Sequence, residues 1–199
     1  MFTGIVRELG TVVLAERAKG ITRLAIDAPK LAPALQPLDS LAVNGVCLSV
    51  VAVRQPLVTC DVIRETLTRT TLGTVRRGDR VNLEPSLLIT DRLNGHMVFG
   101  HVDGVGVVTS RQRAAGEHRL RIRVATGLRS WLVPKGPVTL DGVSLTVGAA
   151  LTPTTFTVHL IPETLRLTTL GSCGPGERLN IEIDYFAKLL RQFMRSNGH

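Results

Sequence analysis

The chain has 199 residues, which suits one large domain or two domains of about 100 residues each. Hydrophobic residues make up 44% of it and aromatic residues only 4%, so any core must be built from aliphatic side chains. The net charge of +8 raises the question of a nucleic-acid partner. No Lys/Arg-rich stretch carries the interleaved aromatics that stack on bases, so we interpret the charge as a basic, solvated surface.

The three cysteines, Cys47, Cys60 and Cys173, form no CxxC pair. Their odd number and spacing predict neither a disulfide framework nor a zinc site, and they fit the reducing cytoplasm. No apolar run approaches the roughly 18 residues of a membrane-spanning helix. Because Met1 already belongs to a repeated segment, we expect no signal peptide before the first domain.

In chain order, the first half reads as short strands separated by turn residues. Period-two patterns and β-branched residues predict strands over residues 4–15, 21–26, 46–53, 57–63 and 80–84. Turns are expected at Lys19-Gly20 and Asn44-Gly45, a short helix or irregular connection over 28–36, and a loop with one helical turn over 65–73. With one further strand, this pattern predicts a small six-stranded antiparallel barrel.

The same order of segments then returns. NGVCLSV at 44–50 reappears as DGVSLTV at 141–147, and GDRVNLE at 78–84 reappears as GERLNIE at 176–182. The offset drifts only from 96 to 98 residues, which is too long for a solenoid and indicates duplication of a whole domain. We therefore expect one barrel over residues 1–95 and a second over 96–185, with 85–95 as the connection.

The tail, residues 186–199, has no counterpart in the first half. Its apolar residues follow helical spacing and predict an amphipathic helix: Phe186, Leu189, Leu190, Phe193 and Met194. A helix of this length is marginal alone in water. It either packs on its own barrel or joins copies of the chain, and we favour the second reading.

Polar residues at matching places in the two copies are the candidates for chemistry. Cys47 and Ser49 correspond to Ser144 and Thr146, and each pair lies two residues apart on one face of a strand. They either line a pocket or fill the core. The sequence matches no P-loop, dinucleotide-binding glycine motif, nucleophile elbow or HExxH.

Histidines and charged residues break the symmetry between the copies. His101 stands where the first copy has Ile5, and it is either a proton-transfer group or a structural histidine. His96 and His159 look structural. Lys135, Asp141 and Asp184 also gather in the second half. This pattern predicts one pocket that only binds and one that also moves protons.

Several segments carry a specific resemblance to the riboflavin synthase alpha-chain family. They are MFTGIV at 1–6, NGVCL at 44–48, GHVDG at 100–104, DGVSLTV at 141–147 and IPETL at 161–165. The resemblance implies an all-β fold of two tandem six-stranded Greek-key barrels, followed by a helix that builds a homotrimer. A non-catalytic lumazine- or flavin-binding relative and a basic RNA-binding barrel are the rival readings.

The implied reaction is a dismutation, in which two molecules of 6,7-dimethyl-8-ribityllumazine give riboflavin and 5-amino-6-ribitylaminouracil without a metal or organic cofactor. By the family pattern, the residues nearest the chemistry are His101, Ser144, Thr146, Asp184, Lys135 and Phe2. The first pocket would be lined by Gly4, Ile5, Val6, Cys47, Leu48, Ser49, Asp61, Val62, Ile63, Arg64, Glu65 and Thr66. The second would be lined by Gly100, His101, Val102, Lys135, Ser144, Leu145, Thr146, His159, Leu160, Ile161, Pro162, Glu163 and Thr164.

The resemblance also implies that the reacting pair forms where the first barrel of one subunit faces the second barrel of the next. A lumazine synthase is a further expected partner, and the cytoplasm is the expected compartment. Phe99, where the family usually has a small residue, departs from the pattern and is expected to reshape the second pocket.

Overall fold

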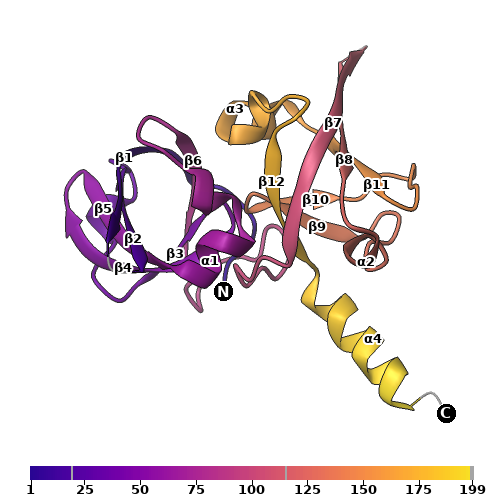
Figure 1. Ribbon diagram of the computed structural model, residues 1–199, viewed down its shortest axis with the longest axis horizontal. Helices are drawn as coiled ribbons and strands as arrows, with labels where there is room; N and C mark the ends of the chain where they lie inside the picture. The colour runs from indigo at the N-terminus through magenta and orange to yellow at the C-terminus, as the bar shows by residue number, and fades with distance from the viewer. Residues whose placement is uncertain (19, 115, 198–199) are drawn as a thin grey trace.

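The computed structural model describes residues 1–18, 20–114 and 116–197. Two β-rich bodies lie side by side, and the helix at the C-terminus extends away from the second of them (Figure 1). The turn expected at Lys19-Gly20 and the last two residues of the expected tail fall wholly or partly outside the described residues.

The first body is a closed antiparallel barrel with the strand order β1-β2-β5-β4-β3-β6. Four expected strands match β2, β4, β5 and β6 closely, and the strand expected at 4–15 begins only at Glu8. The strand missed by the sequence patterns is β3. The strands are β1 (Glu8–Ala18), β2 (Ile21–Asp27), β3 (Ser40–Val43), β4 (Val46–Arg54), β5 (Leu57–Ile63) and β6 (Arg80–Pro85). Short helices connect them: η1 (Ala32–Ala34), α1 (Arg64–Arg69) and η2 (Thr71–Thr74).

The second body repeats this winding, with the strand order β10-β9-β12-β7-β8-β11. Its outer strands, β10 and β11, meet through the single bridge between Val147 and Val158, so one seam lacks a full ladder. The elements are β7 (Gly104–Ala114), β8 (Glu117–Arg123), α2 (Thr126–Arg129), β9 (Pro137–Leu140), β10 (Val143–Thr146), β11 (Thr155–Leu160), α3 (Pro162–Leu167), η3 (Thr169–Gly171) and β12 (Arg178–Ile183). The duplicated all-β fold is thus confirmed.

Each body has its own aliphatic core. Leu24 and Ile26 are fully buried in the first, and their counterparts Leu120 and Ile122 are fully buried in the second. Along β8 the buried Leu120 and Ile122 alternate with more exposed neighbours, which is the period-two pattern of a sheet with one buried face, whereas in β2 Ala25 between Leu24 and Ile26 is buried as well. With few aromatic residues in the chain, both cores are therefore built mainly from β-branched residues and leucines.

Two segments run between the bodies, and we call them the first arm (residues 2–6) and the second arm (residues 98–102). They pair with each other: the Phe2 N–H donates to the Val98 carbonyl at 2.7 Å, and the Val98 N–H donates to the Phe2 carbonyl at 3.1 Å. The arms then separate, each toward the body formed by the other copy. Val6 joins the core of the second body, and Val102 packs on that of the first.

Two buried asparagines join the bodies beside the arms. The Asn82 amide donates to the Asp141 carbonyl at 2.8 Å, and the Asn180 amide donates to the Asn44 carbonyl at 2.8 Å. Asn82 and Asn180 are both 1% exposed, so each contact is made away from water. The identical exchange in both directions gives the molecule an internal pseudo-twofold axis.

Helix α4 (Tyr185–Asn197) confirms the amphipathic tail helix. Its apolar side chains are left on the surface of the chain, with exposed fractions of 48% to 72%: Phe186, Leu189, Leu190, Phe193 and Met194. The contacts with its own barrel come instead from the other side, where the Arg191 guanidinium lies 4.1 Å from the Trp131 ring. An apolar stripe exposed to water adds no stability to a single chain. Such a stripe is typical of a surface that another molecule covers.

Candidate active site

A cavity of about 510 Å³ lies at the open seam between β10 and β11. It is lined by Lys135, Ser144, Leu145, Thr146, Val147, Gly148, Ala149, His159, Ile161 and Thr164. The seam exists because β10 ends at Thr146, and only one bridge joins the chain beyond it to β11. Seven residues expected in the second pocket thus lie together, whereas Leu160 points into the core and Pro162 and Glu163 are exposed on α3.

Ser144 in this cavity is hydrogen-bonded to a histidine for which the sequence suggested only a structural role. The Nδ1 atom of His96 lies 2.7 Å from Ser144 Oγ, and its Nε2 atom lies 3.2 Å from Thr139 Oγ1. Burial lowers the pKa of His96, while the nearby charge of Asp184 raises it in part. Because a neutral imidazole has one donor and one acceptor nitrogen, it can accept the Ser144 proton while donating to Thr139.

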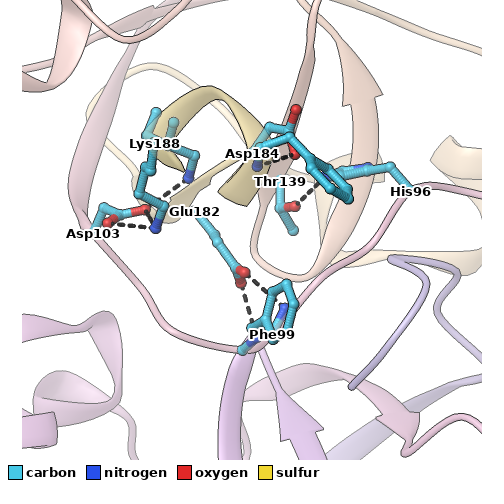
Figure 2. A network of polar contacts seen from close by, with 10 residues as sticks. His96, Phe99, Asp103, Thr139, Glu182, Asp184 and Lys188 are labelled. Atoms are coloured by element: carbon cyan, nitrogen blue, oxygen red, sulfur yellow. Dashed lines mark hydrogen bonds and ion pairs between the residues drawn. The ribbon is translucent and has the colours of Figure 1, made fainter. Parts of the chain in front are cut away.

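Asp184 stands at the end of β12, close to His96 and Thr139 (Figure 2). Its Oδ1 accepts a hydrogen bond from the Phe186 N–H at 3.2 Å, which caps the first turn of α4. The charge of Asp184 therefore acts on His96, and its hydrogen bond caps the start of α4.

Each arm lies on the barrel opposite to the one whose pocket its residues were expected to line. The Ser144 N–H donates to the Gly4 carbonyl at 2.7 Å, and a Cβ added to Gly4 would lie 2.6 Å from the Cβ of Ser144. In the same way, the Cys47 N–H donates to the Gly100 carbonyl at 2.9 Å, and a Cβ on Gly100 would meet Cys47 at 2.6 Å. Residues 4–6, expected in the first pocket, therefore lie against the second barrel, and residues 100–102, expected in the second pocket, lie against the first.

Two buried carboxylates hold the arms in these positions. Glu84 on β6 accepts from the Thr3 and Gly4 N–H groups at 2.7 and 3.0 Å, and from the Thr3 hydroxyl at 2.7 Å. Glu182 on β12 accepts from the Phe99 and Gly100 N–H groups at 2.7 and 2.9 Å. The matching GDRVNLE and GERLNIE segments carried this signal, since both end in the glutamate.

The other residues expected in the first pocket lie on the first barrel, along β4, β5 and α1. Cys47 is half-buried, Ser49 is exposed, and Asp61 makes two 2.8 Å contacts with Arg23, a hydrogen bond that lowers the pKa of Asp61. Leu48 and Val62 are buried, Thr66 is partly exposed, and Ile63, Arg64 and Glu65 are exposed. Phe2 is fully buried with Ala42 and Val98, and Cys47 packs on this cluster from its edge.

A backbone similarity identifies the counterpart of Lys135. Both Lys135 and Leu38 have positive φ values, of 63° and 79°, and their N–H groups donate to Val147 and Val50, which are themselves counterparts. The cavity on the second barrel therefore has an ammonium group where the first barrel has an apolar side chain. His159 likewise corresponds to Asp61, so the two barrels carry different ionisable groups at two places.

Among the described residues, no three His, Cys, Asp or Glu side chains gather in a way that could hold a metal ion. Within the same ranges, no helix has the length and apolar character to cross a membrane. All three cysteines are free thiols, and burial raises the pKa of Cys60 to about 12.

Comparison with known proteins matches this duplicated architecture. The model of the lumazine binding domain family matches the chain twice, over residues 3–86 and 99–184. Riboflavin synthase of Mycobacterium bovis is 44% identical over 201 residues, and the match covers 100% of both chains. The chain belongs to the riboflavin synthase family. Riboflavin synthase of Bacillus subtilis, 37% identical, matches 98% of this chain and 90% of its own length.

The fold of this riboflavin synthase family member also matches solved structures of LumP. The complex of LumP with 6,7-dimethyl-8-(1'-D-ribityl) lumazine has a TM-score of 0.83 at 23% identity, covering 92% of this chain and 99% of LumP. The complex with riboflavin has a TM-score of 0.84 at 24% identity, with the same coverage. At this level of identity, the likeness concerns the fold.

Proposed function

We propose that this chain is a riboflavin synthase, which converts two molecules of 6,7-dimethyl-8-ribityllumazine into riboflavin and 5-amino-6-ribitylaminouracil. The observation that carries the proposal is the full-length match to riboflavin synthases, with a lumazine binding domain in each half. In the reaction, one lumazine gives up a four-carbon unit and the other receives it.

We assign the proton and nucleophile chemistry of the second pocket to His96 and Ser144. The imidazole, kept neutral by burial, is placed to take the Ser144 proton, so that Oγ can add to the ring that gives up its carbons. Thr146 and Lys135 lie in the same cavity and supply a hydroxyl and a cation to the ring or ribityl chain. Asp184 stabilises the protonated imidazole that forms during the transfer.

In the first pocket, we propose that the lumazine lies between Cys47 and Ser49 on β4 and Asp61 and Thr66 near α1, with the second arm as a wall. His101 then belongs to the first pocket, because its neighbours Gly100 and Val102 both contact the first barrel. Its ring is exposed, which leaves it free to meet a methyl proton of a ring bound beside it.

We propose that the working site pairs the first pocket of one chain with the second pocket of another in a homotrimer. Within one chain, contacts run from Cys47 to Gly100, from Val98 to Phe2 and from Gly4 to Ser144, so both arms stand between the two pockets. The pocket of a second chain can face a pocket of the first without the arms between them. The exposed apolar stripe of α4 is a surface through which the second chain can bind. We also place the protein in the cytoplasm, with a lumazine synthase as a further partner.

The direct test mixes the purified protein with 6,7-dimethyl-8-ribityllumazine and follows riboflavin by absorbance and chromatography. Turnover that gives the two products in equal amounts supports the proposal, and Ser144→Ala serves as the matched inactive control. Tight binding of the lumazine without riboflavin would instead identify a non-catalytic lumazine-binding protein of the same fold.

A further inference from the structure

The second arm is attached to α4. Asp103, which directly follows the arm, receives the Lys188 ammonium group on both carboxylate oxygens, at 2.9 and 2.8 Å. The two side chains are only 25% and 26% exposed, so this ion pair is better shielded than most surface pairs. Within the arm, the Phe99 ring lies 4.9 Å from the ring of Tyr185, the first residue of α4. Figure 2 shows the Glu182 carboxylate turned toward Phe99 in the arm, and the Asp103 carboxylate turned toward Lys188.

The other side of the same arm forms part of the first barrel's pocket wall. The Gly100 carbonyl accepts from the Cys47 N–H at 2.9 Å, and Val102 packs on the first core. The second arm therefore contacts α4 through Phe99 and Asp103. A residue between these two contacts Cys47 on the first barrel, where we expect the ligand.

Lys188 also acts on the carboxylate that holds the arm. Burial raises the pKa of Glu182 to about 7, hydrogen bonds from the Phe99 and Gly100 N–H groups lower it, the charge of Lys188 lowers it further, and the charge of Asp103 raises it. Since the ionised carboxylate is the stronger acceptor, Lys188 favours the state that binds the arm. Asp103 Oδ2 also accepts from the Ile183 N–H at 2.8 Å, which ties the arm to β12 just before α4.

The first arm lacks this attachment. Glu84 holds Thr3 and Gly4 as Glu182 holds Phe99 and Gly100, but the first copy has no helix after its last strand. Arg7, the counterpart of Asp103, is exposed. The link from α4 thus reaches only the arm that lies on the first barrel.

We propose that Lys188 and Asp103 are positioning residues, through which α4 sets the second arm against Cys47 and so tunes ligand binding in the first pocket. The proposal rests on the proposed function, because it takes that pocket to bind ribityl ligands. It gives α4 a role beyond joining subunits: the helix places a wall of a pocket in its own chain.

The test compares Lys188→Met with Arg191→Met in the full-length protein. Both remove a cation from α4, but Lys188 pairs with Asp103 beside the arm, whereas Arg191 stacks on Trp131 and hydrogen-bonds to Ser130 on the barrel. Riboflavin binding is followed by fluorescence, kcat and KM are measured with the lumazine, and the mass in solution is recorded. We expect Lys188→Met to weaken one class of riboflavin site and raise KM about fivefold or more, with a smaller change in kcat. Lys188→Arg should restore binding, and Asp103→Asn combined with Lys188→Met should be no worse than either change alone.

Equal behaviour of Lys188→Met and Arg191→Met overturns the inference. So does a loss of affinity that appears only together with a loss of mass, because α4 would then act through assembly alone. A wild-type protein that neither binds riboflavin nor turns over the lumazine overturns the proposed function instead, and the two failures are thereby distinguished.

Discussion

His96 Nδ1 lies 2.7 Å from the Oγ of Ser144, a residue that lines the cavity on the second barrel. The first copy does not repeat this pair, because Cys47 stands where the second copy has Ser144. The two barrels therefore share a fold but carry different polar groups at this position.

Removing either member of this pair should lower turnover far more than it lowers stability. We expect Ser144→Ala and His96→Gln each to reduce kcat about 100-fold, the lower range for a general base. Because the two residues act as one unit, the double variant should be no slower than the slower single variant. Ser172→Ala, at an exposed serine, is the control. An unchanged kcat in Ser144→Ala would remove this serine from the mechanism.

The close approach of the arms to β4 and β10 makes Gly4 and Gly100 sensitive positions. Both have positive φ values, of 75° and 73°, and an added Cβ would lie 2.6 Å from a neighbouring side chain. Alanine should therefore displace the arm as well as strain the backbone. We expect Gly4→Ala and Gly100→Ala to weaken binding in the second and first pockets respectively, and to destabilise the protein by more than about 2 kcal/mol.

Gly78→Ala is the matched control for this pair, because Gly78 also has a positive φ, of 96°, but its added Cβ would meet nothing within 4 Å. It should cost only the backbone strain, about 1 kcal/mol. Chemical denaturation and ligand titration measure both effects. Equal losses in all three variants would mean that the arms can move aside.

The buried carboxyl of Asp141 should make stability depend on pH. Burial raises its pKa to about 7, although a hydrogen bond from the Asn180 N–H lowers it. In an unfolded chain an aspartate is protonated only below about pH 4. Between about pH 4 and pH 7, the folded state therefore binds one proton that the unfolded state does not. The stabilisation by the protonated form is therefore complete below about pH 4 and is lost as the pH rises toward 7.

Asp141→Asn removes this dependence and keeps the acceptor, as Asn44 does in the first copy, where its Oδ1 accepts from the Asn82 N–H at 2.7 Å. The variant should gain stability relative to the wild type as the pH rises from 4 to 7, by up to a few kcal/mol, with no further gain above that range. Urea unfolding at several pH values measures the difference. A difference that stays constant from pH 4 to pH 8 would contradict the assignment.

Charge on the apolar stripe of α4 should separate the subunits. Leu190 and Phe193 are 65% and 68% exposed in the single chain, so Leu190→Asp with Phe193→Asp costs the monomer little. We expect the mass in solution to fall toward 21.5 kDa, as measured by light scattering. Gln192→Asp, also exposed on α4 but outside the stripe, is the control. A double variant that stays trimeric would show that other surfaces hold the subunits together.

A site shared between chains should allow complementation. Thr66→Trp is designed to fill the first pocket, and Thr164→Trp, at the counterpart residue in the second cavity, to fill the second. Each homotrimer should be impaired. When the two are refolded together, some junctions pair two intact pockets, and activity should exceed the average of the parents. If mixed trimers are present by mass and activity stays at the average, the site lies within one chain.

Most of the strands could be predicted because duplication shows the same pattern twice. β3 was missed because Leu41, Ala42 and Val43 are all buried, and a short strand without alternation carries no period-two signal. The strand order of the second barrel could also be predicted, because it repeats that of the first. The seam with a single bridge could not, because it depends on the residue at which β10 ends.

The arms and His96 could not be placed from the sequence. A repeat shows that Gly4 and Gly100 are equivalent, but nothing in the pattern shows that each crosses to the other barrel. His96 carried no repeat signal, and its role depends on Thr139 and Ser144, which lie more than 40 residues away along the chain. Long-range packing, rather than local preference, decides both features.

The crossed arms also have a meaning for the origin of the chain. Contacts that repeat identically in both directions, such as those of Asn82 and Asn180, are those of an isologous dimer interface. The arms then correspond to swapped segments between two former protomers, which the connection at residues 85–95 later joined into one polypeptide. A single half released from its twin would expose the surface its partner's arm had covered, and it would complete that surface by pairing with a second copy of itself.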